Sequence, residues 1–193
     1  MHPEIQERVF DEIQLINGVD EDREKMHDGN CDRTSDDNQI NYDFEKLSQM
    51  HFIERVLKES MRLFPIGPSI VREATDNVKI TDCTIPKGAW PIISIYHMHR
   101  DPKYWGDDAD LFRPDRFLPD RMSGRSPYCY LPFGAGPRNC IGSKYAMISM
   151  KIMLAQMVNR YRFRTNLKYH ELQLKFELLL KLSNNFSIQV ERR

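Results

Sequence analysis

One stretch in the C-terminal half decides the fold of this 193-residue sequence: Phe133-Gly134-Ala135-Gly136-Pro137-Arg138-Asn139-Cys140-Ile141-Gly142. Its glycines and its proline shape a tight loop, and helical periodicity begins directly after that loop. Gly136 allows a backbone conformation that other residues rarely adopt, and Gly142 lets the following helix approach a flat ligand closely. Arg138 adds a permanent cation that suits a carboxylate. We refer to residues 133–142 as the cysteine loop.

Cys140 lies at the predicted start of the helix that follows the loop. Free N–H groups and the positive end of a helix dipole favour a thiolate over a thiol at such a position. A thiolate beneath a flat ligand that carries carboxylates indicates haem iron with an axial cysteine, a ligation that favours O–O bond cleavage. The alternative is a buried structural cysteine beside a glycine-rich turn, which is the usual role of a lone cysteine.

The cysteine loop resembles the haem-ligand loop of the cytochrome P450 family, Phe-x-x-Gly-x-Arg-x-Cys-x-Gly, and it has all five specified residues. Five matches within ten positions favour the haem site over a structural cysteine. The resemblance implies that Cys140 is the axial iron ligand and that Phe133 packs beside its sulfur. It also implies that Arg138 and Arg72 each anchor a haem propionate. For Arg72, an exposed arginine on a strand is the alternative.

Two further segments match the same family in the same order. Residues 59–62 (Glu-Ser-Met-Arg) resemble its Glu-x-x-Arg helix, and residues 112–117 (Phe-Arg-Pro-Asp-Arg-Phe) resemble its Pro-x-Arg-Phe element. Taken alone, such a pair on one helix face favours a surface ion pair worth under about 1 kcal/mol. The resemblance implies instead that Glu59, Arg62 and Arg116 form a buried structural triad, which we call the charge cluster.

Apolar residues at helical spacing predict helices, and short β-prone runs predict strands. The predicted helices are Pro3 to about Ile16, Asp43 to Pro65, and Ile141 to about Tyr161; the predicted strands are Ser69–Arg72, Val78–Ile80, Ala89–Ile95, Leu172–Leu182 and Phe186–Val190. Asn17-Gly18 is expected to end the first helix, and Pro86-Lys87-Gly88 to form the turn between the second and third strands. This order predicts an α+β fold, mainly α with small β-sheets.

Two long segments lie outside these elements. Residues 19–41 hold too few apolar side chains to offset the entropy of ordering them, so we expect a mobile surface loop. Residues 98–139 are rich in Pro, Gly, Asp and Arg and show little periodicity. A segment of that length within a compact domain is expected to be functional. His97 and His99 near its start lack a third metal ligand at a suitable spacing, and we interpret both as structural.

Composition limits the possible classes of protein. The longest apolar runs are much shorter than 18 residues, which excludes a membrane-spanning helix within this sequence. Four cysteines without a Cys-x-x-Cys motif argue against a disulfide framework and a four-cysteine zinc site, and favour a reduced, intracellular setting. Residues 1–60 carry 16 acidic and 7 basic side chains, whereas residues 61–193 carry 12 and 21. The basic part suits an anionic ligand, an acidic partner, or ordinary solvation.

The resemblance covers the whole chain, and in detail it is to the animal microsomal family-4 group and its insect relatives. It implies a haem-thiolate monooxygenase with haem b, which inserts one oxygen atom from dioxygen into a hydrophobic small molecule. Electrons would come from an NADPH-dependent flavoprotein reductase, with no nucleic acid partner. The implied location is the cytoplasmic face of the endoplasmic reticulum membrane.

Members of the family are well over twice as long as this chain. We therefore expect residues 1–193 to be the C-terminal portion of a single cytochrome P450 domain, without its distal half, its membrane anchor or distal catalytic residues. Membrane contact would come only through that missing anchor, and the chain alone is expected to be inactive. Two alternatives remain open: a haem-binding partial chain without turnover, and a reductase-independent haem-thiolate isomerase or dehydratase.

Overall fold

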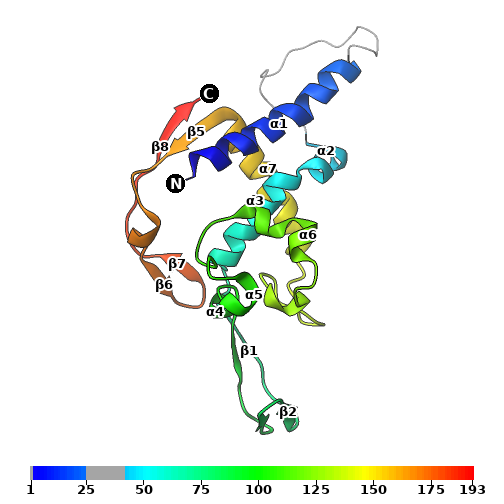
Figure 1. Cartoon of the computed structure of the whole chain (residues 1–193), viewed down its shortest axis with the longest axis vertical. Coiled ribbons are helices and arrows are strands. Elements are labelled where there is room, and N and C mark those ends of the chain that lie inside the picture. Colours follow the sequence, from blue (N-terminus) through cyan, green and yellow to red (C-terminus); the bar gives the residue numbers. More distant parts are fainter. Residues whose placement is uncertain (1, 25–41) are drawn as a thin grey trace. The chain divides into compact units, whose positions relative to one another are not determined.

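The computed structural model describes residues 2–24 and 42–193, which fall into two compact units (Figure 1). The first unit takes in the described residues up to 57, together with 142–172 and 185–193. The second takes in 58–141 and 173–184. Helix α3 (His51–Leu63) begins in the first unit and ends in the second.

The first unit is helical with one small sheet. Besides the start of α3, its elements are α1 (Pro3–Glu24), α2 (Phe44–Gln49), α7 (Ser143–Arg160), β5 (Tyr161–Arg164), η3 (Tyr169–Glu171) and β8 (Gln189–Arg192). Helix α1 packs against α7, as Figure 1 shows, and β5 pairs with β8 in antiparallel register. The core between the helices consists of Val9, Ile13, Ile16, Leu47, Met50, Phe52, Ile53, Ala155 and Val158. Helix α7 confirms the helix that periodicity predicts after the cysteine loop.

Helix α1 does not end where the sequence suggests. It continues through Asn17-Gly18 to Glu24, so the prediction of an end near Ile16 is wrong, and residues 19–24 are helical rather than part of a loop. One glycine inside a helix costs only about 1 kcal/mol, which the flanking helical residues can offset. Residues 25–41, the rest of the expected mobile loop, lie outside the described residues.

The second predicted helix is divided in two. Asp43 caps α2 as expected, because its carboxylate accepts a hydrogen bond from Lys46 N at 2.8 Å. The helix is then interrupted at Met50 before α3 begins. The carboxylate of Glu12 accepts from Phe52 N at 2.6 Å and Ile53 N at 2.8 Å, which satisfies two free N–H groups at the new helix start. A capping group some 40 residues away leaves no local sequence signal.

The second unit is built from short elements. Besides the end of α3, they are β1 (Ser69–Val71), β2 (Val78–Ile80), β3 (Cys83–Ile85), β4 (Ile92–Ser94), α4 (Ile95–Met98), α5 (Pro102–Trp105), η1 (Pro114–Phe117), α6 (Pro119–Met122), η2 (Pro127–Cys129), β6 (Leu174–Phe176) and β7 (Leu180–Leu182). Three two-stranded antiparallel sheets pair β1 with β4, β2 with β3, and β6 with β7. The expected α+β class, mainly helical with small sheets, is confirmed.

The observed strands differ from the predicted ones in several places. Strand β3 was not predicted, and it, rather than the strand after Pro86-Lys87-Gly88, pairs with β2. The predicted strand Ala89–Ile95 shortens to β4, which pairs with β1 and places Ser94 opposite Ser69. The single tail strand over residues 172–182 is two strands, β6 and β7, and β5 follows α7 directly. Runs of only three residues carry too little periodicity to fix such boundaries.

Segment 98–139 contains short helical turns that pack around a second core. Trp105, Ala109, Phe117 and Cys129 are buried together there, and the Trp105 and Phe117 rings lie 5.8 Å apart. Burial raises the pKa of the Cys129 thiol, which is thus a packed side chain. Across both described ranges, no helix combines the length and apolar character needed to cross a membrane.

Candidate functional site

The charge cluster is centred on the last turns of α3. Glu59 and Arg62 are both completely buried, one helical turn apart on the same face. Arg62 Nε donates to Glu59 Oε2 at 2.7 Å, and Arg62 Nη2 donates to Glu59 Oε1 at 2.9 Å. This bidentate geometry is the strong form of a charge-assisted hydrogen bond.

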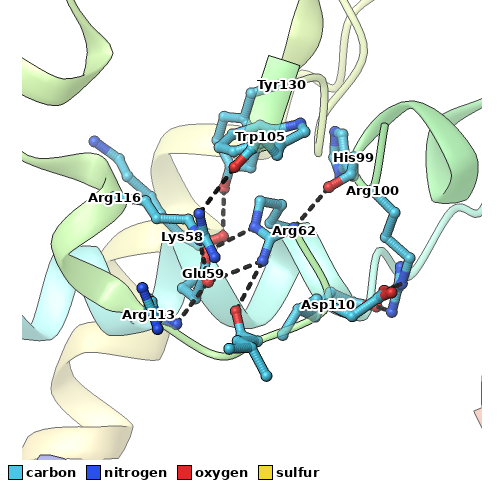
Figure 2. A network of polar contacts seen from close by, with 12 residues as sticks. Lys58, Glu59, Arg62, His99, Arg100, Trp105, Asp110, Arg113, Arg116 and Tyr130 are labelled. Atoms are coloured by element: carbon cyan, nitrogen blue, oxygen red, sulfur yellow. Dashed lines mark hydrogen bonds and ion pairs between the residues drawn. The ribbon is translucent and has the colours of Figure 1, made fainter. Parts of the chain in front are cut away.

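Arg116, from η1, joins the same carboxylate (Figure 2). Its Nε lies 3.4 Å from Glu59 Oε1 as an ion pair, without the direction of a hydrogen bond. Its Nη1 donates to Trp105 O at 3.0 Å and lies 2.6 Å from Asp108 Oδ1. The hydrogen bond from Arg116 holds the pKa of Asp108 below its usual value. The structure thus brings together all three residues of the expected triad.

The charge cluster also binds the backbone of segment 98–139. Arg62 Nη1 donates to His99 O at 2.7 Å and Arg62 Nη2 to Leu111 O at 3.2 Å. In the other direction, Arg113 N donates to Glu59 Oε1 at 2.7 Å. One buried ion pair therefore fixes three separate points of an otherwise irregular segment, which explains how so long a segment is ordered.

The cysteine loop is shaped by two glycines in the left-handed region. Gly134 has a φ of 73° and Gly136 a φ of 77°, a conformation that L side chains rarely adopt. Cys140 N donates to Phe133 O at 2.8 Å, and Asn139 N donates to Gly136 O at 3.1 Å. These bonds close the loop and leave Cys140 exposed, three residues before α7 begins at Ser143, so the predicted helix start at Ile141 is two residues too early. The sequence analysis identified Gly136 but missed the equal requirement at Gly134.

A cleft of about 590 Å³ lies beside the cysteine loop within the second unit. Four of the six residues predicted to bind the cofactor line it, namely Arg72, Phe133, Arg138 and Cys140. Gly136 and Gly142 are not among its lining residues. Much of the remaining wall is apolar, from the end of α3, from β1 and from the residues before the loop. Cavities of this size and character bind small organic ligands or cofactors.

The cleft combines two cations with an exposed thiol. Arg72 and Arg138 are both exposed, and among residues 2–24 and 42–193 neither forms an ion pair with a carboxylate. Arg72 Nη1 donates to the carbonyl of the preceding Val71, at 2.9 Å. Haem b has a flat apolar ring, two carboxylates and an iron that accepts a thiolate. The donor set and the apolar wall fit that group.

The two histidines have different surroundings. His97 is exposed, and its Nδ1 lies 2.7 Å from Ser94 Oγ. His99 is completely buried, and its Nε2 accepts from Leu131 N at 2.8 Å. In the part of the chain that the structure describes, neither belongs to a group of three or more potential metal ligands. The link from His99 to Leu131 is a contact that the sequence analysis missed, because it joins residues 32 positions apart.

Comparison with known proteins agrees with this arrangement. The sequence profile of the family described as Cytochrome P450 matches residues 1–190. "Probable cytochrome P450 313a4" of Drosophila melanogaster is 37% identical over 194 residues, covering 100% of this chain and 36% of that protein. "Cytochrome P450 4V2" of Homo sapiens is 38% identical over 149 residues, covering 77% of this chain and 28% of that protein.

These relatives confirm the expected similarity to the family-4 group and to insect proteins. The chain spans about a third of the length of the curated relatives it matches. The match of the family profile nevertheless extends over almost every residue. This chain belongs to the cytochrome P450 family.

Proposed function

We propose that this chain forms the thiolate side of a haem-thiolate monooxygenase that inserts one oxygen atom from dioxygen into a hydrophobic small molecule. The observation that carries the proposal is the cleft, because Cys140, Phe133, Arg72 and Arg138 line it together with apolar residues. When bound, haem iron supplies dioxygen activation, and a cysteine ligand favours O–O bond cleavage.

Each residue of the cleft has a distinct role in this proposal. The Cys140 thiolate binds the iron, and the guanidinium groups of Arg72 and Arg138 hold the two propionates. Phe133 packs beside the sulfur and keeps water from it. Gly136 lets the loop turn beneath the ring, and Gly142 leaves room for α7 to begin close to it.

The charge cluster supports this site without touching the ligand in our proposal. Glu59, Arg62 and Arg116 hold segment 98–139, which leads directly into the cysteine loop. Electrons would come from an NADPH-dependent flavoprotein reductase, and the location would be the cytoplasmic face of the endoplasmic reticulum membrane. Both of these statements rest on family resemblance.

The test replaces the proposed ligand in the full-length protein. In Cys140→His, we expect loss of the strongly red-shifted Soret band of the ferrous carbon monoxide complex, because imidazole does not donate as a thiolate does. Cys83→Ser is the matched control, since Cys83 is also an exposed free cysteine but lies on β3, outside the cleft. Survival of the band in Cys140→His would show that another residue holds the iron.

A second measurement separates a monooxygenase from the reductase-independent alternative. Substrate consumption that requires both reductase and dioxygen, with label from ¹⁸O₂ found in the product, supports the proposal. Turnover without reductase and without label in the product would assign the chain to an isomerase or dehydratase.

A further inference from the structure

His99 contacts the charge cluster directly and is linked to the cysteine loop through Leu131, which lies two residues before the loop. It is the C-cap residue that follows α4, and its side chain is completely buried. Its carbonyl accepts from Arg62 Nη1 at 2.7 Å, while its ring Nε2 accepts from Leu131 N at 2.8 Å. The ring also stacks on Tyr130, with centroids 5.1 Å apart and planes at 29° (Figure 2).

Leu131 connects His99 to the cysteine loop. Its side chain lines the cleft, and its carbonyl accepts from Gly134 N at 3.1 Å. Gly134 is one of the two glycines whose positive φ shapes the loop. A continuous chain of hydrogen bonds therefore runs from Arg62 through His99 and Leu131 to Gly134, within one compact unit.

The hydrogen bond to Leu131 defines the protonation state of His99. A backbone N–H can only donate, so Nε2 carries no proton and the neutral ring has its proton on Nδ1. That Nδ1 is buried and makes no hydrogen bond within the described ranges. Protonation of Nε2 would place two donors face to face and break the link.

The groups around the ring also favour the neutral form. The charged neighbours are the guanidinium of Arg62 from α3, whose charge Glu59 partly balances, and that of Arg100 from the following turn. The Tyr130 hydroxyl is directed to Lys58 O at 2.9 Å. Burial lowers the pKa of His99 to about 4, although the backbone carbonyls of Arg62 and Met61 act in the opposite direction.

We propose that neutral His99 is a positioning residue for the cysteine loop, because its acceptor nitrogen holds Leu131 and thereby sets how Cys140 is presented to the iron. The role as an iron-ligand support rests on the proposed function, whereas the link between His99 and Leu131 does not. Protonation of the ring should release the loop. His99 touches neither the ligand nor Cys140 in this proposal, so it acts only through Leu131.

Two variants of the full-length haem protein separate the acceptor from the ring. His99→Phe keeps an aromatic ring against Tyr130 but has no acceptor, whereas His99→Gln has an acceptor oxygen at a similar reach but no ring. In His99→Phe we expect at least roughly tenfold faster hydrogen exchange of the Leu131 amide, since the amide is then held by no partner. We also expect part of the thiolate-type carbon monoxide band to be lost. In His99→Gln, we expect the exchange of the Leu131 amide and the carbon monoxide band to be close to those of the wild type.

A pH titration gives a third readout. In the wild type, the Leu131 amide should become exchange-labile, beyond the intrinsic pH effect, as pH falls toward 4. His99→Gln should lack this step because an amide does not titrate. Tyr130→Phe, which keeps the ring against His99 and removes the hydroxyl that donates to Lys58 O, is the matched control and should leave the exchange of the Leu131 amide unchanged.

The outcomes are distinguishable. Unchanged Leu131 exchange in His99→Phe, or equal loss in His99→Gln and His99→Phe, would overturn the proposal, because the acceptor would then be irrelevant. If His99→Phe does not fold, the pH dependence of Leu131 amide exchange still tests the proposal. The step toward pH 4 should be present in the wild type and absent in His99→Gln, and any other result would overturn the proposal. If the wild type lacks the thiolate-type band, the proposed function fails, while the exchange measurements test the His99 link independently.

Discussion

The charge cluster and Cys140 lie in the same compact unit, yet their polar groups are used in opposite ways. Glu59 and Arg62 are completely buried and satisfy each other, with the surplus donors of Arg62 taken up by backbone carbonyls. Arg72, Arg138 and Cys140 are exposed around an apolar cleft, and within the described ranges no carboxylate pairs with the two arginines. One region therefore pairs its charges internally and holds the fold, whereas the other leaves its charges unpaired at a cleft, where they are available to a ligand.

Breaking the charge cluster should have the largest effect on stability. Glu59→Ala leaves the buried guanidinium of Arg62 without its carboxylate and leaves Arg116 with Asp108 alone, which costs roughly 3–5 kcal/mol of unfolding free energy. We expect little soluble, haem-loaded protein from the full-length gene. Glu73→Ala is the control, because Glu73 is an exposed carboxylate in the same unit. Normal yield and haem content in Glu59→Ala would show that the pair is dispensable.

The free energy of unfolding should depend on pH because His99, which is bonded to the charge cluster, has a lowered pKa. Its pKa is lowered from 6.5 to about 4 in the folded state, so the unfolded chain binds this proton more tightly. The stability from neutral His99 is therefore complete above about pH 6.5 and is lost progressively as pH falls toward 4, by roughly 3 kcal/mol in total.

Chemical unfolding from pH 7.5 to pH 4 in the wild type and in His99→Gln measures this dependence. Subtracting the two curves removes the contribution of the carboxylates, including Asp108, whose lowered pKa makes stability fall in acid as well. Parallel curves would mean that the buried ring does not titrate in this range.

The two left-handed glycines test the shape of the cysteine loop. Gly134→Ala and Gly136→Ala should each cost about 1–2 kcal/mol, because a Cβ is strained at a φ of 73° or 77°. An added Cβ at Gly134 would lie 3.6 Å from Ile70 Cδ1, and one at Gly136 would meet no atom within 4 Å, so backbone strain dominates at both. Gly67→Ala, also without neighbours but without a positive φ, should change the unfolding free energy by under about 0.5 kcal/mol. Equal effects at all three positions would contradict a special loop geometry.

The arginines of the cleft should have the smallest effect, and only on ligand binding. Arg72→Gln and Arg138→Gln would each remove one of the exposed ion pairs to a propionate that we propose, worth about 1 kcal/mol or less, or roughly fivefold in haem affinity. Haem transfer to an acceptor protein measures this, with the exposed Arg121→Gln on α6 as control. Loss of apoprotein stability in either variant would show that these cations serve the fold instead.

What the sequence could predict depends on how local the cause is. The cysteine loop and α7 were predictable because glycine positions and helical spacing lie within a few residues of one another. The break at Met50 was not, because Glu12 caps α3 from another helix. The bond from Leu131 N to His99 was missed for the same reason, because a contact between distant residues gives no periodic signal. Strand β3 pairs with the adjacent β2, and it was missed because a run of three residues carries too little periodicity.

The charge cluster shows the intermediate case. Spacing alone places Glu59 and Arg62 on one helix face but favours an exposed pair of little value. Only the family resemblance indicated burial and the third partner, Arg116, which comes from a turn 54 residues beyond Arg62. Structure adds the backbone acceptors, including His99 and Leu111, that make burial of the pair tolerable.

The division between a charge cluster that holds the fold and a cysteine that serves a ligand is tested most directly by one measurement, the unfolding free energy of the full-length apoprotein carrying Cys140→Ser. Because Cys140 is exposed and its side chain fills no core, we predict a value within about 0.5 kcal/mol of the wild type. A loss of several kcal/mol in the absence of haem would show that Cys140 is a structural cysteine, and it would contradict the account.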